Sequence, residues 1–468
     1  MARERVNGTK VPMEKYSMAM TRTPFIAVLL TLPMWAQDPL SLKDAVHLAL
    51  KQNKSIQASG AASKAAESRM TGARSGSLPK INYSESWTRS DNPVFVFSSL
   101  LTQRQFGEQN FQINALNRPG FLNNFQSQLT VDQSLFDAGA TKHAIRSAEL
   151  AADISSEEVR RTQMEMIAGT IRAYYDALLA KEQIVATNQA QRSSEADLVR
   201  AQNVRSAGMS TDVDVLSIRV QLSAIREQEI RRNADLDIAR ATLNDVLGLP
   251  LDTPHTLTTS LAPLTLPGEA LAQYEASALT ERPESRQAKL ATSLAETQVA
   301  LAHGSLLPQV GARAVFEADR QRFYAQGGAD WLVSIGLRWN LFNGFSDKAH
   351  VEETKFALQR SRAEQDRAGS TIRLQVRRMY ADLQAAQQRI EVTNASVNEA
   401  EESLRITQNR YEAGFGNVTD LLRTETAVLE ARTRHLAAIH DQRVAAAMLE
   451  FAAGTLTADS EVLNEGTR

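Results

Sequence analysis

The sequence predicts a mainly α-helical protein with a small β part, organised as two internal repeats. Ala, Leu, Glu, Gln and Arg are abundant along most of the chain, and these residues favour helix. The stretch from Trp331 to Leu341 differs, because apolar residues occupy every second position, as in a strand with one apolar and one polar face. Similar motifs also recur at a constant separation, which indicates a duplicated architecture.

Composition excludes several classes of protein. The formal net charge of -2 over 468 residues argues against a nucleic-acid binder that works through a general basic surface, so we expect no nucleic-acid partner. The absence of Cys excludes disulfides, thiolate metal sites, a cysteine nucleophile and a lipidated N-terminal Cys.

An apolar run near the N-terminus, "PFIAVLLTLPMWA" from Pro24 to Ala36, is too short for a membrane-spanning helix and contains Pro33. A basic residue precedes it and a plausible cleavage site ends it, which predicts a signal peptide over residues 1–36 and an exported mature protein. A buried N-terminal segment of a cytoplasmic protein is the alternative. Three internal methionines could also be the true start, namely Met13, Met18 and Met20.

The repeats are read from paired motifs. "SLFDAGATKHAI" from Ser134 resembles "NLFNGFSDKAHV" from Asn340, and "RSAGMSTDVDVL" from Arg205 resembles "YEAGFGNVTDLL" from Tyr411. "SLPKINY" and "LLPQVGA" form a third pair further upstream, and their larger spacing predicts an insertion in the first copy, between residues 91 and 120. The first repeat therefore covers residues 37–266, and the second covers residues 267–468 with a C-terminal tail.

Each repeat is expected to contain a helix, two strands, a very long helix, a tight turn and a further helix. The leading helices should run over about 41–77 and 267–305, where Pro79 and Pro308 end them. The strands are expected at about 79–90, 121–136, 308–318 and 330–342. The long helical hairpins are expected at about 140–247 and 346–451.

The long helices lack Pro and, at about 1.5 Å per residue, should extend on the order of 100 Å. Apolar residues in the second one recur at alternating spacings of four and three, a heptad seam for packing against another helix. An ordinary two-stranded coiled coil would explain this seam equally well. Its members are Ile372, Val376, Met379, Leu383, Ala386, Ile390, Thr393, Val397, Ala400 and Leu404.

The strands favour a membrane over a coiled coil. A strand of about ten residues with one apolar and one polar face is typical of a bacterial outer-membrane barrel, whose outside meets lipid and whose inside meets water. Trp331 and Trp339 lie on the apolar face and are roughly 26 Å apart at about 3.3 Å per residue, so they are predicted to mark the two membrane interfaces. A soluble sheet packed on a helix would explain the alternation but not the paired tryptophans. Since small barrels need about eight strands, four strands require oligomerisation, and three chains would supply twelve.

Taken together, the duplicated "LP" before a strand, the "LF-D/N-G" step into the long helix and the "AG…T-D…L" turns resemble the TolC-type outer-membrane efflux factors. The resemblance covers nearly the whole mature chain. It implies a homotrimeric channel with a twelve-stranded membrane β-barrel, four strands per chain, continued by a long periplasmic α-helical coiled-coil barrel.

The resemblance further implies an outer-membrane protein that extends into the periplasm and contacts outer-membrane lipid. Its function would be that of the channel subunit in a tripartite efflux or type I secretion system. Its partners would be a periplasmic adaptor (membrane fusion) protein and an inner-membrane transporter. A soluble periplasmic coiled-coil structural protein is the alternative function.

No catalytic constellation is visible, so we expect no enzyme, no cofactor and no metal site. His435 and His440 are five positions apart, which does not place two ligands on one helix face, and we expect solvated helix surface there. Gly327 and Gly328 are interpreted as flexible residues of an inter-strand connection. An envelope-bound enzyme would need a clustered site.

The two turns of the helical hairpins are the candidate functional site. Gly208 and Gly414 are expected to adopt left-handed turn conformations, and Asp212 and Thr419 to cap the following helices. In the family these turns form the periplasmic tip and dock the adaptor. The positions assigned to docking are Arg205, Gly208, Ser210, Asp212, Arg410, Gly414, Asn417 and Thr419.

The family resemblance also implies a gate at this tip. A Tyr and an Asp that bond neighbouring hairpins fall on Tyr411 and Asp214, whereas the second bond falls on Gly416 and Val213, which cannot form it. Two acidic rings found at the constriction in one family member would fall on Asp420 and Arg423. Only the first of these positions is acidic, which puts strong cation selectivity in doubt.

Overall fold

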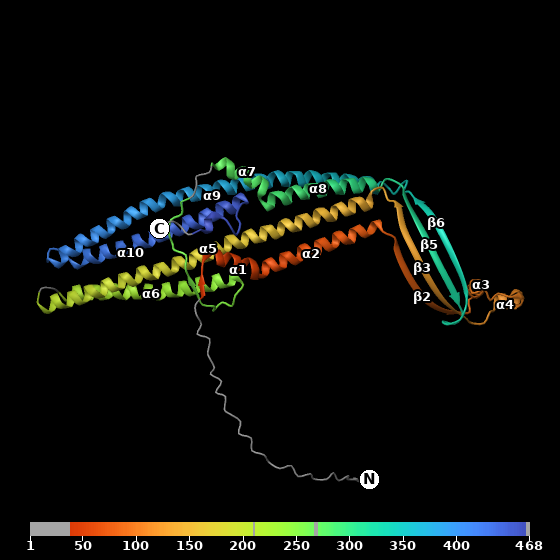
Figure 1. Cartoon of the computed structure of the whole chain (residues 1–468), viewed down its shortest axis with the longest axis horizontal. Coiled ribbons are helices and arrows are strands. Elements are labelled where there is room, and N and C mark those ends of the chain that lie inside the picture. Colours follow the sequence, from red (N-terminus) through yellow and green to blue (C-terminus); the bar gives the residue numbers. More distant parts are fainter. Residues whose placement is uncertain (1–37, 209–210, 266–269, 465–468) are drawn as a thin grey trace, which may run out of the picture. The chain divides into compact units, whose positions relative to one another are not determined.

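The structure is a computed structural model that describes residues 38–208, 211–265 and 270–464. The predicted signal peptide, residues 1–36, lies outside this range. Figure 1 shows that long helices dominate the architecture, and a four-stranded sheet and a two-stranded sheet accompany them in the described residues. No helix within the described ranges is both long enough and apolar enough to cross a membrane.

The sheet contains four antiparallel strands from the two repeats. Its order is β2-β3-β5-β6, so β3 of the first repeat pairs with β5 of the second, and β2 and β6 form the edges (Figure 1). β6 ends four residues before the predicted position, because the chain turns toward the next helix there. The bounds are β2 Lys80–Ser90, β3 Leu122–Phe136, β5 Gln309–Arg320 and β6 Gly328–Arg338.

Both strand-to-helix connections use the left-handed region of backbone conformation. Ala138 and Gly139 have φ values of 55° and 84°, and Gly344 and Phe345 both have φ of 68°. These connections lead directly into the two longest helices, α5 (Ala140–Ser206) and α9 (Ser346–Glu412). Each turns back into a shorter partner, α6 (Asp212–Leu247) after α5 and α10 (Val418–Ala453) after α9.

The leading helices are broken in both repeats, whereas the sequence predicted continuous ones. Asn53 separates α1 from α2 because its extended backbone ends the first helix, while its side chain accepts a hydrogen bond from the Ser55 backbone N–H at 2.8 Å and starts the second. Pro283 begins α8 after Arg282 has left helical geometry. The bounds are α1 Leu42–Gln52, α2 Lys54–Arg74, α7 Leu271–Glu281 and α8 Pro283–Gly304.

The core lies along the middle of α5, which contacts α1, α2, α6, α8 and α10. Tyr174 is fully buried there and donates a hydrogen bond from its hydroxyl to the Leu40 carbonyl at 2.8 Å. Arg443 of α10 is also buried. Its Nε donates to the Ala262 carbonyl at 2.8 Å and its guanidinium lies 5.7 Å from the ring centre of Tyr175, and these contacts offset part of the cost of burying the charge. Two short strands pair near this core, β1 (Asp38–Leu40) and β4 (His255–Leu257).

The predicted insertion between β2 and β3 is folded and is not an irregular loop. It contains α3 (Pro93–Thr102), a 3₁₀ turn (Glu108–Phe111) and α4 (Ile113–Asn117). Asn92 caps α3, because its side-chain oxygen accepts hydrogen bonds from the backbone N–H groups of Val94 and Phe95 at 3.0 and 3.2 Å. Pro93 occupies the first helical position.

Candidate functional site

The first hairpin turn joins α5 to α6. Gly208 has φ of 77°, as the sequence predicted for a turn glycine. The predicted cap at Asp212 is wrong, because Thr211 is the N-cap and forms a capping box with Asp214. Asp212 instead makes an ion pair with Arg205, with Nε and Oδ1 2.5 Å apart. Ser210, predicted to contribute to docking, lies outside the described residues.

The second turn, between α9 and α10, has the same geometry but a different cap. Gly414 has φ of 77°, and Asn417 replaces Thr419 as the N-cap because its side chain accepts from the Asp420 N–H at 2.8 Å. The carboxylate of Asp420 in turn accepts from the Asn417 amide at 2.9 Å. A hollow of about 560 Å³ beside this turn is lined by residues that include Arg410, Asp420 and Arg423.

Tyr411 lies near the end of α9 and is half-buried. It packs against a small apolar cluster of Ala201, Val215, Ile218 and Val418, which joins the ends of both hairpins. Burial raises the pKa of Tyr411, and the nearby carboxylate of Asp214 raises it further. The structure therefore brings two of the predicted gate residues close together. Val213 has an apolar side chain and Gly416 has none, so neither can supply a second side-chain bond.

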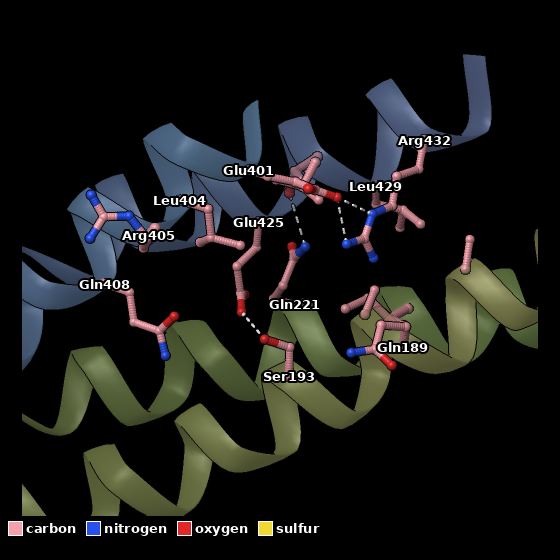
Figure 2. A pocket seen from close by; sticks show the side chains of 15 residues that line it. Gln189, Ser193, Gln221, Glu401, Leu404, Arg405, Gln408, Glu425, Leu429 and Arg432 are labelled. Carbon is pink, nitrogen blue, oxygen red and sulfur yellow. Dashed lines mark hydrogen bonds and ion pairs between the residues drawn. The ribbon is translucent and has the colours of Figure 1, made fainter. Parts of the chain in front are cut away.

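A polar junction between the hairpins was not predicted. Glu425 of α10 and Asp197 of α5 are 9% and 2% exposed, and Ser193 donates a hydrogen bond to Glu425 at 3.0 Å. Figure 2 shows that Glu425 and Ser193 line a cavity between the two hairpins. The volume of this cavity is about 300 Å³. The sequence did contain a signal: Glu425 lies between Leu421 and Val428 at spacings of four and three, where a seam residue would be apolar.

The electrostatics of this junction favour a protonated carboxyl group. Burial raises the pKa of Glu425 to about 8, and the neighbouring Asp197 acts in the same direction. Asp197 is itself paired with Arg200 at 2.7 Å, and Arg200 also reaches Glu412 of α9 at 3.1 Å. At neutral pH the acid pair therefore carries a proton that an isolated glutamate would have lost.

Other polar contacts also join the two repeats. Gln221 of α6 donates to the hydroxyl of Thr426 at 3.1 Å (Figure 2). His440 of α10 lies 2.7 Å from Asp176 of α5, so the predicted solvated surface is wrong at this position. Burial lowers the pKa of His440, but hydrogen bonds to Asp176 and Asp441 outweigh it and raise that pKa overall.

The sheet has one apolar and one polar face, as the alternation indicated. Trp331 is 77% exposed on the apolar face, together with Val333, Ile335 and Leu337 of β6. Trp339 is 54% exposed and lies just beyond the end of β6, where its Nε1 donates to the Leu306 carbonyl at 3.1 Å.

Both faces of the sheet contain ionic or polar contacts that hold the strands together. On the polar face, the amide of Gln126 donates to Glu317 at 2.6 Å. On the apolar face, Glu85 pairs with Arg320 at 2.9 Å and accepts from the hydroxyl of Tyr83 at 2.7 Å. The alternation in β3 and β6 did not predict this ion pair, which comes from β2 and the end of β5.

Comparison with known proteins identifies the family. The model of the outer membrane efflux protein family matches residues 45–249 and 276–455, one segment in each repeat. The chain belongs to the outer membrane efflux protein family. The two matched segments together contain both hairpin turns and all four strands of the sheet.

Relatives of this outer membrane efflux protein include secretion proteins. It is 27% identical to protein CyaE of Bordetella pertussis over 424 residues, which cover 90% of this chain and 85% of CyaE. It is also 27% identical to the alkaline protease secretion protein AprF of Pseudomonas aeruginosa over 438 residues, covering 91% and 86%. The CmeC outer membrane channel of Campylobacter jejuni has the same fold, with a TM-score of 0.77 at 15% identity over 90% of this chain and 87% of CmeC.

The family is one of transport proteins, and the geometry agrees with that role. The turns present caps, an ion pair and a half-buried tyrosine, and the junction presents an acid pair that is hydrogen-bonded to Ser193. Across the described ranges, no three His, Asp or Glu residues are grouped so that they could hold a metal ion.

Proposed function

We propose that three copies of this chain assemble into a continuous channel through the outer membrane and the periplasm. The observation that carries the proposal is the four-stranded sheet, whose edge strands β2 and β6 are at opposite sides of the order β2-β3-β5-β6. Unpaired backbone groups at such edges are costly in lipid, and pairing β6 of one copy with β2 of the next removes them. The exposed apolar face would then contact lipid, and the polar face would line the lumen.

The helices support the same assembly. α9 exposes large apolar side chains along its length, with Phe356, Leu374 and Val392 each about 70% exposed or slightly less. α6 does the same through Val220 and Ile230, which are 71% and 70% exposed. Isolated apolar residues on a surface are ordinary, but several large ones on both α9 and α6 are expected if these helices are buried against a neighbouring subunit.

The proposed activity is passive conduction of a substrate delivered by an inner-membrane transporter and a periplasmic adaptor. The names of relatives include secretion of proteases and export of pyoverdine, so a type I secretion or efflux system is the proposed context. The adaptor would dock at the hairpin turns, which present Arg205, Asp212, Arg410 and Thr419 alongside the cap Asn417. Gly208 and Gly414 would keep these turns tight.

The gate is proposed to lie at the same turns. Tyr411 and Asp214 would hold the tip closed, and Asp420 and Arg423 would line the narrowest part of the tunnel. The absence of a second side-chain bond at Gly416 and Val213 gives a resting tip that opens more easily than one with two bonds.

Charge placed on each face of β6 tests the proposed membrane topology. Val333→Arg is expected to cost about 2 to 4 kcal/mol near the bilayer midplane and to reduce the amount of membrane-inserted trimer. Ser334→Asn, its neighbour on the polar face, is the matched control and should assemble normally. Trimer is measured by non-denaturing electrophoresis after cell fractionation. Equal effects of both substitutions, or a soluble monomer of the parent protein, would support the periplasmic coiled-coil alternative instead.

A further inference from the structure

The two inter-strand connections are very different in the two repeats. β5 and β6 are joined by the short segment 321–327, whereas β2 and β3 are joined by residues 91–121, which fold into α3, a 3₁₀ turn and α4. The connection between β2 and β3 has its own aromatic cluster, because Phe106 packs edge-on against Phe97 and Phe111, with ring centres 4.8 and 5.1 Å away. The insertion is therefore a folded unit.

A buried polar clip fixes this unit to the sheet. Gln103, directly after α3, is 2% exposed, and its amide donates to the Asn123 carbonyl and to the Asn124 side chain, both at 2.9 Å. Asn124 donates in turn to Asp319 of β5 at 2.5 Å. The buried amide N–H groups of Gln103 and Asn124 thus find their acceptors within this clip, and breaking it would leave these donors unpaired.

Close backbone packing fixes the unit a second time. A Cβ atom added to Gly328, the first residue of β6, would lie 1.8 Å from the Thr102 carbonyl oxygen, so any side chain there would displace α3. Arg104 reaches the same strand and donates to the Ala329 carbonyl at 2.9 Å. The glycine at 328 is thus explained by close approach of the insertion, and the predicted flexibility is not its reason.

The face on which the insertion lies follows from the strand register. Asn124, Asp319 and Gly328 belong to the same alternating set as Gln126 and Glu317, which is the polar face. α3 also contacts β3, β5 and β6 near their ends farthest from the long helices (Figure 1). The insertion therefore bends over the polar side of the sheet and away from the apolar side.

We propose that residues 91–121 form an exit cap that is clipped into the outer end of the barrel lumen and limits the size of what can pass there. This inference rests on the proposed channel, in which the polar face lines the lumen. Three caps, one from each subunit, would narrow the outer opening independently of the gate at the periplasmic tip. Gln103 and Gly328 then act as size-determining residues for transport.

The absence of Cys from the chain allows a direct test on intact cells. Ser84→Cys places a thiol on the polar face of β2, deeper than the cap, and Gln109→Cys places one on the cap itself. Each is labelled with a small membrane-impermeant maleimide and with a maleimide carried by a bulky polyethylene glycol. In the parent, we expect the small reagent to reach both positions and the bulky reagent to reach only the cap.

Releasing the cap should open the deeper position to the bulky reagent. Gly328→Val or Gln103→Ala is expected to speed that reaction about tenfold or more, as loss of buried hydrogen bonds or packing shifts an opening equilibrium. Gly336→Val is the matched control, because an added Cβ at Gly336 of the same strand meets no atom within 4 Å.

The outcomes separate the cap from the channel itself. If Ser84→Cys, with no further substitution, forms a trimer on a non-denaturing gel and reacts rapidly with the bulky reagent, the proposed cap is wrong while the proposed channel is still supported. An unchanged rate in both Gly328→Val and Gln103→Ala would also overturn the cap. A parent that forms no trimer and whose Ser84→Cys thiol reacts with neither reagent would overturn the channel, and the cap with it.

Discussion

α5 and α9 occupy equivalent places in the two repeats, and each contains 67 residues, yet they are buried to very different extents. Buried residues are numerous in α5 and include Tyr174, Tyr175 and Leu178, whereas only five residues of α9 are buried. The backbone of the repeat is therefore conserved between the two copies while its environment is not.

The reason for the difference is the position of each helix within the chain. α5 contacts α2 and α6 of its own repeat and also α8 and α10 of the second repeat, so it is surrounded by the same subunit. α9 packs mainly on α10, α8 and α7 and leaves a face exposed. One repeat thus supplies the internal core, and the other supplies a surface that the proposed neighbouring subunit would cover.

The largest expected effect comes from matched leucines in the two helices. Leu178→Ala in α5 should destabilise the subunit by about 2 to 5 kcal/mol, because Leu178 is 1% exposed and its loss leaves a cavity. Leu374→Ala in α9 should change subunit stability by about 0.5 kcal/mol or less, because Leu374 is 68% exposed, but it should lower the fraction of trimer.

Thermal unfolding of the detergent-solubilised protein, followed by circular dichroism, measures the first effect. Non-denaturing electrophoresis over a range of protein concentrations measures the second. Equal destabilisation of the subunit by the two substitutions would contradict the conclusion that α5 is buried within its own subunit and that α9 is largely exposed there.

A smaller effect is expected at the end of α9, where this helix does contact the first repeat. Tyr411→Phe removes the hydroxyl near Asp214 and preserves packing on the apolar cluster around Ala201 and Val215. A hydrogen bond to a charged group contributes roughly 1.5 to 3 kcal/mol, so loss of the proposed bond between Tyr411 and Asp214 in each subunit should raise the open probability of the channel in a planar bilayer. Unchanged conductance and unchanged antibiotic leakage into cells would leave the turn residues as caps and docking surface alone.

The smallest expected effect is a pH dependence at the junction between α10 and α5. The pKa of Glu425 is raised from 4.5 to about 8, so between these pH values the folded protein holds a proton that the unfolded chain releases. Stability contributed at this site is therefore fully present at low pH and is lost as pH rises toward 8. We expect the unfolding temperature of the parent to fall by a few degrees over this range.

Glu425→Gln should reduce this slope, because the amide stays neutral and can still accept from Ser193, and the raised pKa of His440 accounts for the slope that remains. Glu430→Gln on the exposed side of α10 is the control and should keep the slope of the parent. A slope of unchanged size in Glu425→Gln would show that Glu425 is not the titrating group, and His440, whose pKa is also raised, would then be the next residue to test.

The sequence predicted the features that depend on periodicity and spacing. The alternation around Trp331 indicated a two-faced strand, and the paired turn motifs indicated glycines at 208 and 414, because these signals come from local backbone geometry. The break at Asn53 was missed, since it depends on a hydrogen bond from the Asn53 amide to the distant Val246 carbonyl at 2.9 Å. The caps were misplaced by one and two residues because several neighbouring polar side chains compete for the same role.

The candidate site was predictable only where a family motif marked it. Tyr411 and Asp214 were located in this way, but the pair of Asp197 and Glu425 depends on two helices from different repeats meeting side by side. A single sequence shows each of these acids within its own helix and cannot show that they share a buried space. The same limitation applies to Gln103, whose partners lie on β3.

The pairing of β3 with β5 has a consequence for the order in which the protein folds. Phe125 of β3 pairs with Arg320 of β5, so nearly two hundred residues separate these two paired positions in the sequence. The α5–α6 hairpin, in contrast, joins two helices that are neighbours in sequence. Local contacts form early and distant ones late, because loop closure costs entropy before distant contacts compensate for it. The helical hairpins can therefore form while the strands are still unpaired, and the sheet is completed only after the second repeat has emerged. Insertion of the sheet into the membrane would therefore follow the folding of the helical hairpins.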